Sequence, residues 1–191
     1  MRVEGLSALP AIAALLFATG AAAQAPALAE TCTACHGAGG NSRLSGQPSI
    51  AGQPKVFIEN QLVLIREGLR DVPTMAPIVK GLSDEDIGAL ARHFSALPPQ
   101  PVQAGKPVAE RLAAGAALSK QMLCATCHLP GYVGQNQVPR LAGQDEAYLM
   151  LSLKQFRDNP GPGRDTIMAS TLRGLSDAQL GELAHHLAWA R

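Results

Sequence analysis

Apolar residues recur every three to four positions in several separate stretches of the chain, the spacing that places them on one face of a helix. Two of these stretches, residues 56–69 and 148–156, each predict one helix. The residues that carry the pattern are Val56, Phe57, Leu62, Ile65 and Leu69 in the first, and Tyr148, Leu149, Leu153 and Phe156 in the second. No stretch shows the sustained alternation of apolar and polar residues that a strand needs, so the predicted fold class is all-α.

Two more helices are predicted from capping boxes, in which a serine is followed three positions later by an acidic or amide residue. These boxes are Ser83 with Asp86 and Ser176 with Gln179. Apolar residues at core spacing follow each box: Ile87, Leu90 and Phe94 after the first, and Leu180, Leu183 and Leu187 after the second. We expect these residues to be buried.

The chain contains an internal repeat, in which one unit recurs with an offset of about 92 residues. Cys32-Thr-Ala-Cys-His36 corresponds to Cys124-Ala-Thr-Cys-His128, Pro48-Ser-Ile-Ala-Gly-Gln53 to Pro139-Arg-Leu-Ala-Gly-Gln144, Met75 to Met168, and Gly81-Leu-Ser-Asp84 to Gly174-Leu-Ser-Asp177. A further helix is predicted from Glu110 to Met122, before the second Cys pair. The first copy has only Pro26 to Thr31 at this place, so its helix is expected to be short or missing.

A proline-rich stretch between the copies, residues 98–107, predicts a semi-rigid extended linker. The sequence therefore divides into a targeting segment (1–23), an N-terminal unit (24–97), the linker (98–107) and a C-terminal unit (108–191). Units of this size lie near the limit at which one apolar core stabilises a fold, and such units commonly need a covalent or metal staple.

The first 23 residues have the pattern of a cleaved signal peptide. Arg2 is followed by an apolar run around Leu9 to Phe17 and then by small residues that end at Ala23, so the exported mature chain is expected to begin at Gln24. A retained membrane anchor is the alternative, which Pro10 and Gly20 disfavour.

Composition and net charge argue against a disordered chain and against a nucleic-acid-binding protein. Apolar residues make up 47% of the chain and charged residues 16%, which is typical of a globular protein, and a net charge of +1 gives no indication of nucleic-acid binding. The charge is mildly asymmetric, since residues 24–104 sum to −1 and residues 105–191 to +2.

The two Cys-x-x-Cys-His motifs carry the chemistry, because this is the attachment signature of c-type haem. Cys32 and Cys35, like Cys124 and Cys127, lie one helical turn apart and can each form a thioether to a haem edge. The adjacent His36 and His128 are the predicted proximal iron ligands. The sequence therefore predicts two covalently attached haem c groups.

Three other uses of the cysteines are weaker. A thioredoxin-like dithiol needs a βαβ context. A four-Cys zinc site needs closely placed pairs, whereas Cys35 and Cys124 lie in different halves of the chain. Two structural disulfides are compatible with a secreted protein. None of the three accounts for the histidine after each pair.

Methionine is the predicted sixth ligand, since Met75 and Met168 occupy matching positions in segments predicted to be loops ahead of the last helix of each unit. Histidine with methionine raises the reduction potential, as suits an electron carrier. Met122 and Met150 are interpreted as core fillers. His93 and His186 also repeat and are the rival ligands, and His185 is expected at the surface.

With these motifs, the chain resembles the cytochrome c4 family, two-haem periplasmic carriers built from paired class I cytochrome c domains. The resemblance extends from about Glu30 to Trp189. It implies that the carbonyls of Pro48 and Pro139 accept the Nδ1 protons of His36 and His128, the bond that orients an iron-bound imidazole. The chain departs from the family pattern in two places. Leu129-Pro130 follows His128 where the first copy has Gly37, and His93 and His186 stand where the family often has tyrosine.

The resemblance implies an electron carrier without catalytic residues. Its expected partners are redox proteins such as a quinol-oxidising complex and a terminal oxidase, with no nucleic acid and with peripheral membrane association left open. The alternative is a dedicated cytochrome subunit of a dehydrogenase complex, similar to the flavocytochrome sulfide dehydrogenases. A haem enzyme such as a two-haem peroxidase is disfavoured, because both units supply a methionine to the position that a substrate needs.

Overall fold

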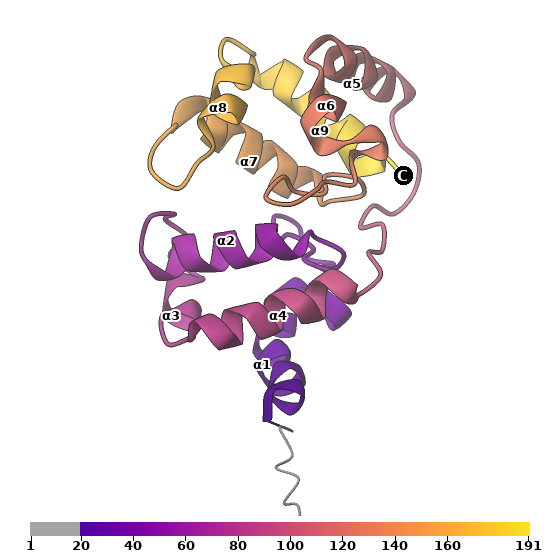
Figure 1. Cartoon of the computed structure of the whole chain (residues 1–191). Coiled ribbons are helices and arrows are strands. Elements are labelled where there is room, and N and C mark those ends of the chain that lie inside the picture. The colour runs from indigo at the N-terminus through magenta and orange to yellow at the C-terminus, as the bar shows by residue number, and fades with distance from the viewer. Residues whose placement is uncertain (1–19) are drawn as a thin grey trace, which may run out of the picture.

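The computed structural model describes residues 20–191 (Figure 1). Residues 1–19, and with them most of the expected targeting segment, lie outside the described part of the chain. Within the described part, no helix combines the length and the apolar content that crossing a bilayer requires.

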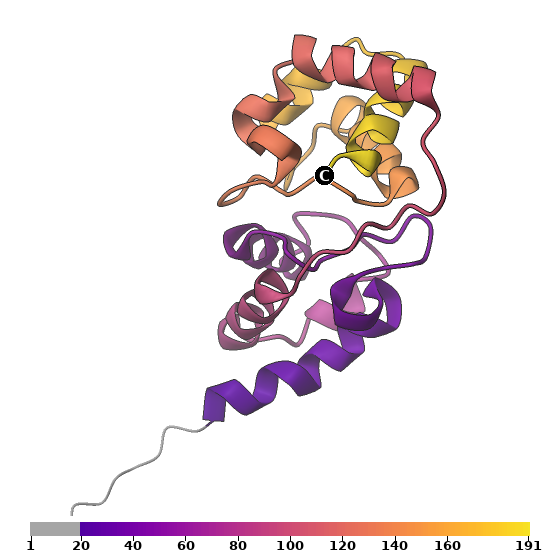
Figure 2. The same cartoon turned by 90° about the vertical axis from the view of Figure 1, so that its right-hand side faces the viewer.

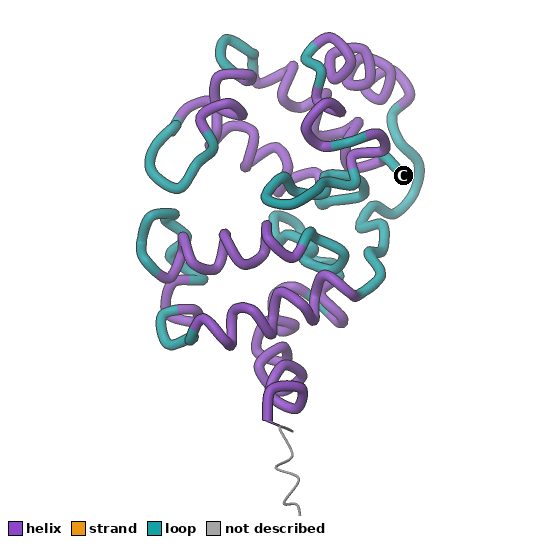
Figure 3. The backbone as a smooth tube through the Cα atoms, in the orientation of Figure 1, coloured by secondary structure: helices purple, strands orange, loops and turns teal. Residues whose placement is uncertain are grey.

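The described residues form helices and loops, as the sequence pattern predicts (Figure 3). One isolated antiparallel bridge joins Gln135 and Val138 within this part of the chain. The N-terminal unit holds α1 (Gly20–His36), η1 (Ala38–Gly40), α2 (Lys55–Arg66), α3 (Ala76–Val79) and α4 (Asp84–Ala96). The C-terminal unit holds α5 (Ala109–Gln121), α6 (Cys124–His128), η2 (Pro130–Tyr132), α7 (Glu146–Asp158), α8 (Thr166–Leu172) and α9 (Asp177–Trp189).

The last helix of each unit begins as its capping box predicts. The Ser83 hydroxyl accepts the Asp86 N–H and the Asp86 carboxylate accepts the Ser83 N–H, and Ser176 and Gln179 form the same reciprocal pair. Each box satisfies two backbone donors that the first helical turn leaves without partners. All six predicted core residues on α4 and α9 are buried.

The helix before the first Cys pair was expected to be short or missing, and this expectation is wrong. α1 runs without a break through Cys32 to His36. Alanine is the best helix former, and Leu28 and Ala29 pack against the apolar face of α4, so packing stabilises the segment. In the C-terminal unit the corresponding helix is interrupted, because Leu123 takes a left-handed conformation (φ 57°) between α5 and α6.

The first and last helices of the C-terminal unit, α5 and α9, cross at Gly115. A Cβ atom at Gly115 would overlap the carbonyl oxygen of Glu182 and lie 2.6 Å from the Cβ of His186. Only glycine leaves room for the two backbones to approach this closely. The core of this unit lies below the crossing, where Leu180, Leu183 and Leu187 of α9 pack with Leu149 and Leu153 of α7.

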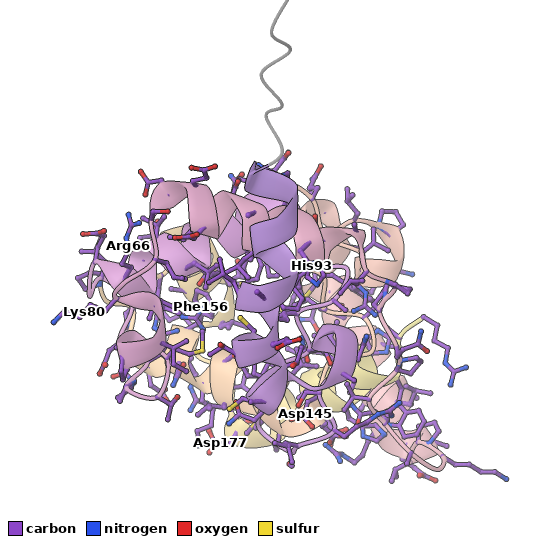
Figure 4. All side chains as sticks on the ribbon, turned by 90° about the horizontal axis from the view of Figure 1, so that it is seen from below. Arg66, Lys80, His93, Asp145, Phe156 and Asp177 are labelled. Atoms are coloured by element: carbon purple, nitrogen blue, oxygen red, sulfur yellow. The ribbon has the colours of Figure 1, made fainter. Side chains whose placement is uncertain are left out.

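In each unit an arginine on the second long helix bonds to the start of the last helix. Arg66 donates to the carbonyl of Leu82 and pairs with Asp84 at 2.8 Å. In the other unit Arg157 donates to Leu175 and pairs with Asp177 at 2.7 Å. Figure 4 shows Arg66 and Asp177 on the two units. The two copies thus fold alike down to individual polar contacts.

The two units are packed against each other, and the chain between α4 and α5 runs along one side of both (Figure 2). This stretch is bonded to each unit. Asn41 Nδ2 donates to the carbonyl of Pro98 in the N-terminal unit, while Gln103 Nε2 donates to the carbonyl of Gln144 in the C-terminal unit. The loops ahead of Met75 and Met168 also meet, since a Cβ at Gly163 would lie 2.5 Å from the carbonyl oxygen of Leu69.

Replacing Gly115 by Ala is expected to destabilise the protein by about 1–3 kcal/mol, because the added methyl group forces α5 and α9 apart. Gly181→Ala is the matched control, since its Cβ would meet nothing nearer than 3.7 Å on the helix α9. The Gly181→Ala substitution is expected to stabilise the folded protein by about 0.5–1 kcal/mol. Urea unfolding of both variants measures the difference, and equal effects would show that the crossing is not tight at Gly115.

Candidate haem sites

Each Cys-x-x-Cys-His motif lies on a helix that ends at its histidine. Cys32 and Cys35 lie on the last turns of α1, and Cys124 and Cys127 form most of α6. In both units the first cysteine is half-buried and the second exposed. Residues three positions apart project from the same side of a helix, so the two sulfur atoms of each motif share one face. The histidine that follows is buried, with 6% of its surface exposed in each unit.

A hydrogen bond to a proline carbonyl orients each of these histidines. The Nδ1–H of His36 donates to the Pro48 carbonyl at 2.7 Å, and that of His128 donates to the Pro139 carbonyl at 2.9 Å. Burial lowers the pKa of both imidazoles, and the bond to the carbonyl raises it by less. Both rings are therefore neutral at pH 7, with the Nε2 lone pair directed away from the loop and available to iron.

Met75 and Met168 lie in corresponding places, although their local structures differ. Met75 directly precedes α3, in a loop as expected. Met168 was also expected in a loop and instead lies in α8, where Asp165 caps the helix by accepting the Met168 N–H at 2.8 Å. This cap, at a position where the first copy has Val72, is the physical reason for the correction. Both methionines are half-buried.

The rival ligand in the C-terminal unit is engaged elsewhere. The Tyr132 hydroxyl bonds to His186 Nε2 at 3.1 Å and to the Ser119 hydroxyl at 2.9 Å, which links α9 to α5. In the N-terminal unit His93, labelled in Figure 4, is half-buried on α4, which packs against α1. The rings of His93 and Phe94 meet in a T-shaped arrangement.

His185 was expected at the surface, and this expectation is wrong, because only 4% of it is exposed. Its Nδ1–H donates to the Glu146 carboxylate at 2.8 Å, and its Nε2 accepts the N–H of Val108 at 3.1 Å. Val108 comes directly after the expected linker. His185 therefore anchors the end of that segment to α7 and α9, and a buried imidazole with both nitrogens bonded is satisfied.

The weaker uses of the cysteines find no support in the geometry. None of the four cysteines forms a disulfide, and the pairs belong to two separate units. Among residues 20–191, no group of three or more His, Cys, Asp or Glu side chains is placed to hold a metal ion.

Arg140 provides an independent test of whether the C-terminal site suits a haem. Its Nη1 is buried and has no hydrogen-bond partner within the described residues, and burial lowers its pKa. A buried guanidinium nitrogen without a hydrogen-bond partner is costly, and a haem carries propionate carboxylates that pair well with arginine. Arg140 directly follows Pro139, whose carbonyl holds His128, so the residue adjoins this site. The residues present therefore fit a haem.

Fold and sites together define a two-domain c-type cytochrome, and comparisons with known proteins agree. The family model described as cytochrome c oxidase, cbb3-type, subunit III matches residues 20–93, and the cytochrome c model matches residues 112–191. A thiosulfate dehydrogenase electron acceptor of Thiomonas intermedia is 34% identical over 95% of this chain and 88% of its own length. Cytochrome c4 of Pseudomonas aeruginosa is 32% identical over 91% of this chain and 90% of its own. The crystal structure of reduced cytochrome c4 from Pseudomonas stutzeri matches with a TM-score of 0.81 and 28% identity, over 89% of this chain and 98% of that one.

The chain belongs to the cytochrome c4 family of two-haem electron-transfer proteins. Accordingly it carries two covalently bound haem c groups, one in each domain.

Replacing Arg140 by Gln is expected to lower the reduction potential of the C-terminal haem by on the order of 50 mV, close to the 59 mV of a tenfold change in a one-electron equilibrium. The reason is that a nearby fixed cation disfavours the extra positive charge of the ferric state. Arg173→Gln is the matched control, because it removes the same charge at an exposed position of the same domain. A redox titration measures both, and an equal shift in the two variants would count against a place for Arg140 beside the haem.

Proposed function

We propose that this protein is a periplasmic carrier that passes single electrons between components of a respiratory chain. One haem is attached at Cys32 and Cys35 with His36 and Met75 as iron ligands, and the other at Cys124 and Cys127 with His128 and Met168. The observation that carries the proposal is the repeated site, in which a buried histidine directly follows two thiols on one helix face and donates Nδ1–H to a proline carbonyl. The corresponding domains are residues 24–97 and 108–191, joined by residues 98–107.

The residues of each site have separate tasks in this proposal. The iron of a bound haem takes up or gives up one electron, and the protein makes or breaks no bond. The thioethers fix the haem in place, and Pro48 and Pro139 hold the two imidazoles in one orientation, which keeps the reorganisation on electron transfer small. The apolar cores under α4 and α9 limit access of water, and burial of this kind is one determinant of the reduction potential.

Secretion is the second part of the proposal. It rests on the signal-peptide pattern that ends at Ala23. Cleavage after Ala23 would leave Pro26 in the first turn of α1, the place where a helix tolerates proline.

A dedicated partner of one dehydrogenase is the second candidate. The Thiomonas relative, at 34% identity, is a thiosulfate dehydrogenase electron acceptor, and this supports a sulfur-compound dehydrogenase as the electron donor. A flavocytochrome-type subunit is the tighter form of the same arrangement. Isolation of the haem-loaded protein from its native periplasm separates the candidates. A free monomer that is reduced by several donors supports the general carrier, and co-elution with one dehydrogenase supports the dedicated partner.

Mass spectrometry of the denatured protein is expected to show the mass of the chain plus two haems. Thioether bonds survive unfolding, whereas a ligated but non-covalent haem is lost. The variant with both Cys32→Ala and Cys35→Ala is expected to keep one haem, and so is the variant with Cys124→Ala and Cys127→Ala. A wild-type protein with fewer than two bound haems, or a double variant that still carries two, would contradict the assignment.

Replacing Met75 or Met168 by Ala is expected to lower the potential of that domain's haem and to open its iron to an added ligand such as imidazole, because the weak sixth ligand is gone. Met150→Ala is the control, since Met150 packs on the core of the C-terminal domain and its loss affects stability alone. Visible spectra and redox titration report the outcome. If the spectra and potentials of both ligand variants match those of the wild type, His93 and His186 become the better candidates.

A further inference from the structure

Two buried glutamines reach across the boundary between the domains. Gln53 and Gln144 occupy the same position in the repeated segment, at the end of the Ala-Gly-Gln sequence that follows the haem-site proline. Gln53 is 4% exposed and Gln144 is 2% exposed. A buried amide needs partners for both its donor and its acceptor, and both glutamines find them in the opposite domain.

Each glutamine binds the backbone of one residue by two hydrogen bonds. Gln144 Oε1 accepts the Ser49 N–H and its Nε2 donates to the Ser49 carbonyl, both at 2.8 Å. Gln53 Oε1 accepts the Arg140 N–H at 3.0 Å and its Nε2 donates to the Arg140 carbonyl at 2.9 Å. Ser49 and Arg140 are themselves equivalent positions, so the two contacts are related by the repeat.

The residue that each glutamine binds directly follows the proline whose carbonyl holds the haem histidine. In the N-terminal domain the peptide group between Pro48 and Ser49 accepts the Nδ1–H of His36 through its oxygen and donates its N–H to Gln144. The peptide between Pro139 and Arg140 likewise joins His128 to Gln53. An acceptor on the N–H side of a peptide makes its carbonyl oxygen more negative, because hydrogen bonds in a chain polarise one another.

We propose that Gln53 and Gln144 are positioning residues for the haem of the opposite domain. Gln144 influences the reduction potential of the N-terminal haem, and Gln53 that of the C-terminal haem. The inference rests on the proposed function, in which His36 and His128 are the proximal ligands. Gln144 polarises the Pro48 carbonyl, which draws the Nδ1 proton of His36 and makes that imidazole a stronger electron donor to iron. A stronger donor favours the ferric state and so lowers the potential of the N-terminal haem. Gln53 does the same for the C-terminal haem.

Gln144→Leu is expected to raise the potential of the N-terminal haem and to leave the C-terminal haem nearly unchanged. The expected change is about two- to fourfold in the one-electron equilibrium constant, or about 20–35 mV at 59 mV per tenfold. The size follows from a cooperative strengthening of about 10–30% in the gross strength of one hydrogen bond. Gln53→Leu is the reciprocal variant and is expected to raise only the C-terminal potential.

The test follows each haem separately in the haem-loaded full chain. Haem-methyl NMR signals report the two potentials during a redox titration, and in the reduced protein the Nδ1–H signals of His36 and His128 report the hydrogen bonds to proline. Gln103→Leu is the matched control for a looser interface, because Gln103 donates to the Gln144 carbonyl and is hydrogen-bonded to neither haem-site peptide group. It is expected to move neither Nδ1–H signal.

Gln144→Glu gives a test with the opposite sign. Its carboxylate can still accept the Ser49 N–H and is a stronger acceptor, so the N-terminal potential is expected to fall and to fall more than the C-terminal one. If Gln144→Leu separates the domains and so cannot be interpreted, Gln144→Glu still tests the inference. Loosened packing admits water to both haems and changes both potentials together, so such a result in all variants would overturn the inference.

The outcomes separate this inference from the proposed function. Wild-type protein without two covalent haems, or with irons not bound by His36 and His128, would refute the proposed function itself. Two correctly ligated haems would refute only the action of each glutamine on the opposite domain, if their potentials do not change in the glutamine variants. The same holds if each potential responds to the glutamine of its own domain. Reciprocal shifts, with the matching change in one Nδ1–H signal, would support it.

Discussion

The Nδ1–H of His36 and that of His128 each donate to a proline carbonyl in the following loop, and this bond fixes the direction in which the imidazole presents its other nitrogen. Much of the surrounding structure serves that contact. The loop of the N-terminal domain is held by the Ile50 N–H on the Gly40 carbonyl and by the Ser42 N–H on the Ser49 hydroxyl. The helix that carries the two thiols ends at the histidine, so the ring enters the loop at a set angle. A ligand held in this way needs little rearrangement when iron changes charge.

The same peptide groups also hold the domains together, which gives the interface its particular character. It is polar at the haem-site loops, where Gln53 and Gln144 satisfy backbone groups of the opposite domain, and Asp145 adds a bond to the Gly46 N–H at 2.8 Å. Buried polar contacts of this kind require correct geometry, so they specify one relative placement of the domains more than they add stability. Two domains of marginal size thereby share structure beyond their own cores.

The sequence was most informative where local chemistry determines the structure. Capping boxes predicted the starts of α4 and α9, and apolar spacing predicted their buried faces, because both signals depend on residues within a few positions. Other features depend on partners distant in sequence. The burial of His185 needs Val108 and Glu146, and the N-terminal part of α1 needs the face of α4. Gln53 and Gln144 could have been noticed as identical polar residues at matching repeat positions. Their hydrogen bonds, however, go to the other domain, and comparing the two copies does not predict such partners. The only sign in the sequence of the unpartnered Nη1 of Arg140 is that the first copy has Ser49 at the matching position.

The repeat makes the domains alike, so the differences that remain carry the functional asymmetry, and the residue after each histidine illustrates the constraint. Gly37 has φ 77° and ψ 168°, and Leu129 has φ 65° and ψ 161°, a region of backbone space that is essentially restricted to glycine. At Gly37 a Cβ would overlap the Asn41 carbonyl oxygen, so glycine is required there. The C-terminal domain keeps this conformation with a leucine, at a cost on the order of 1–3 kcal/mol. Backbone strain of this kind persists only when neighbouring contacts determine the conformation, here the Tyr132 N–H on the Leu129 carbonyl and the Gly134 N–H on that of His128. The direction of the imidazole is therefore maintained even where the sequence has departed from the residue that adopts it freely.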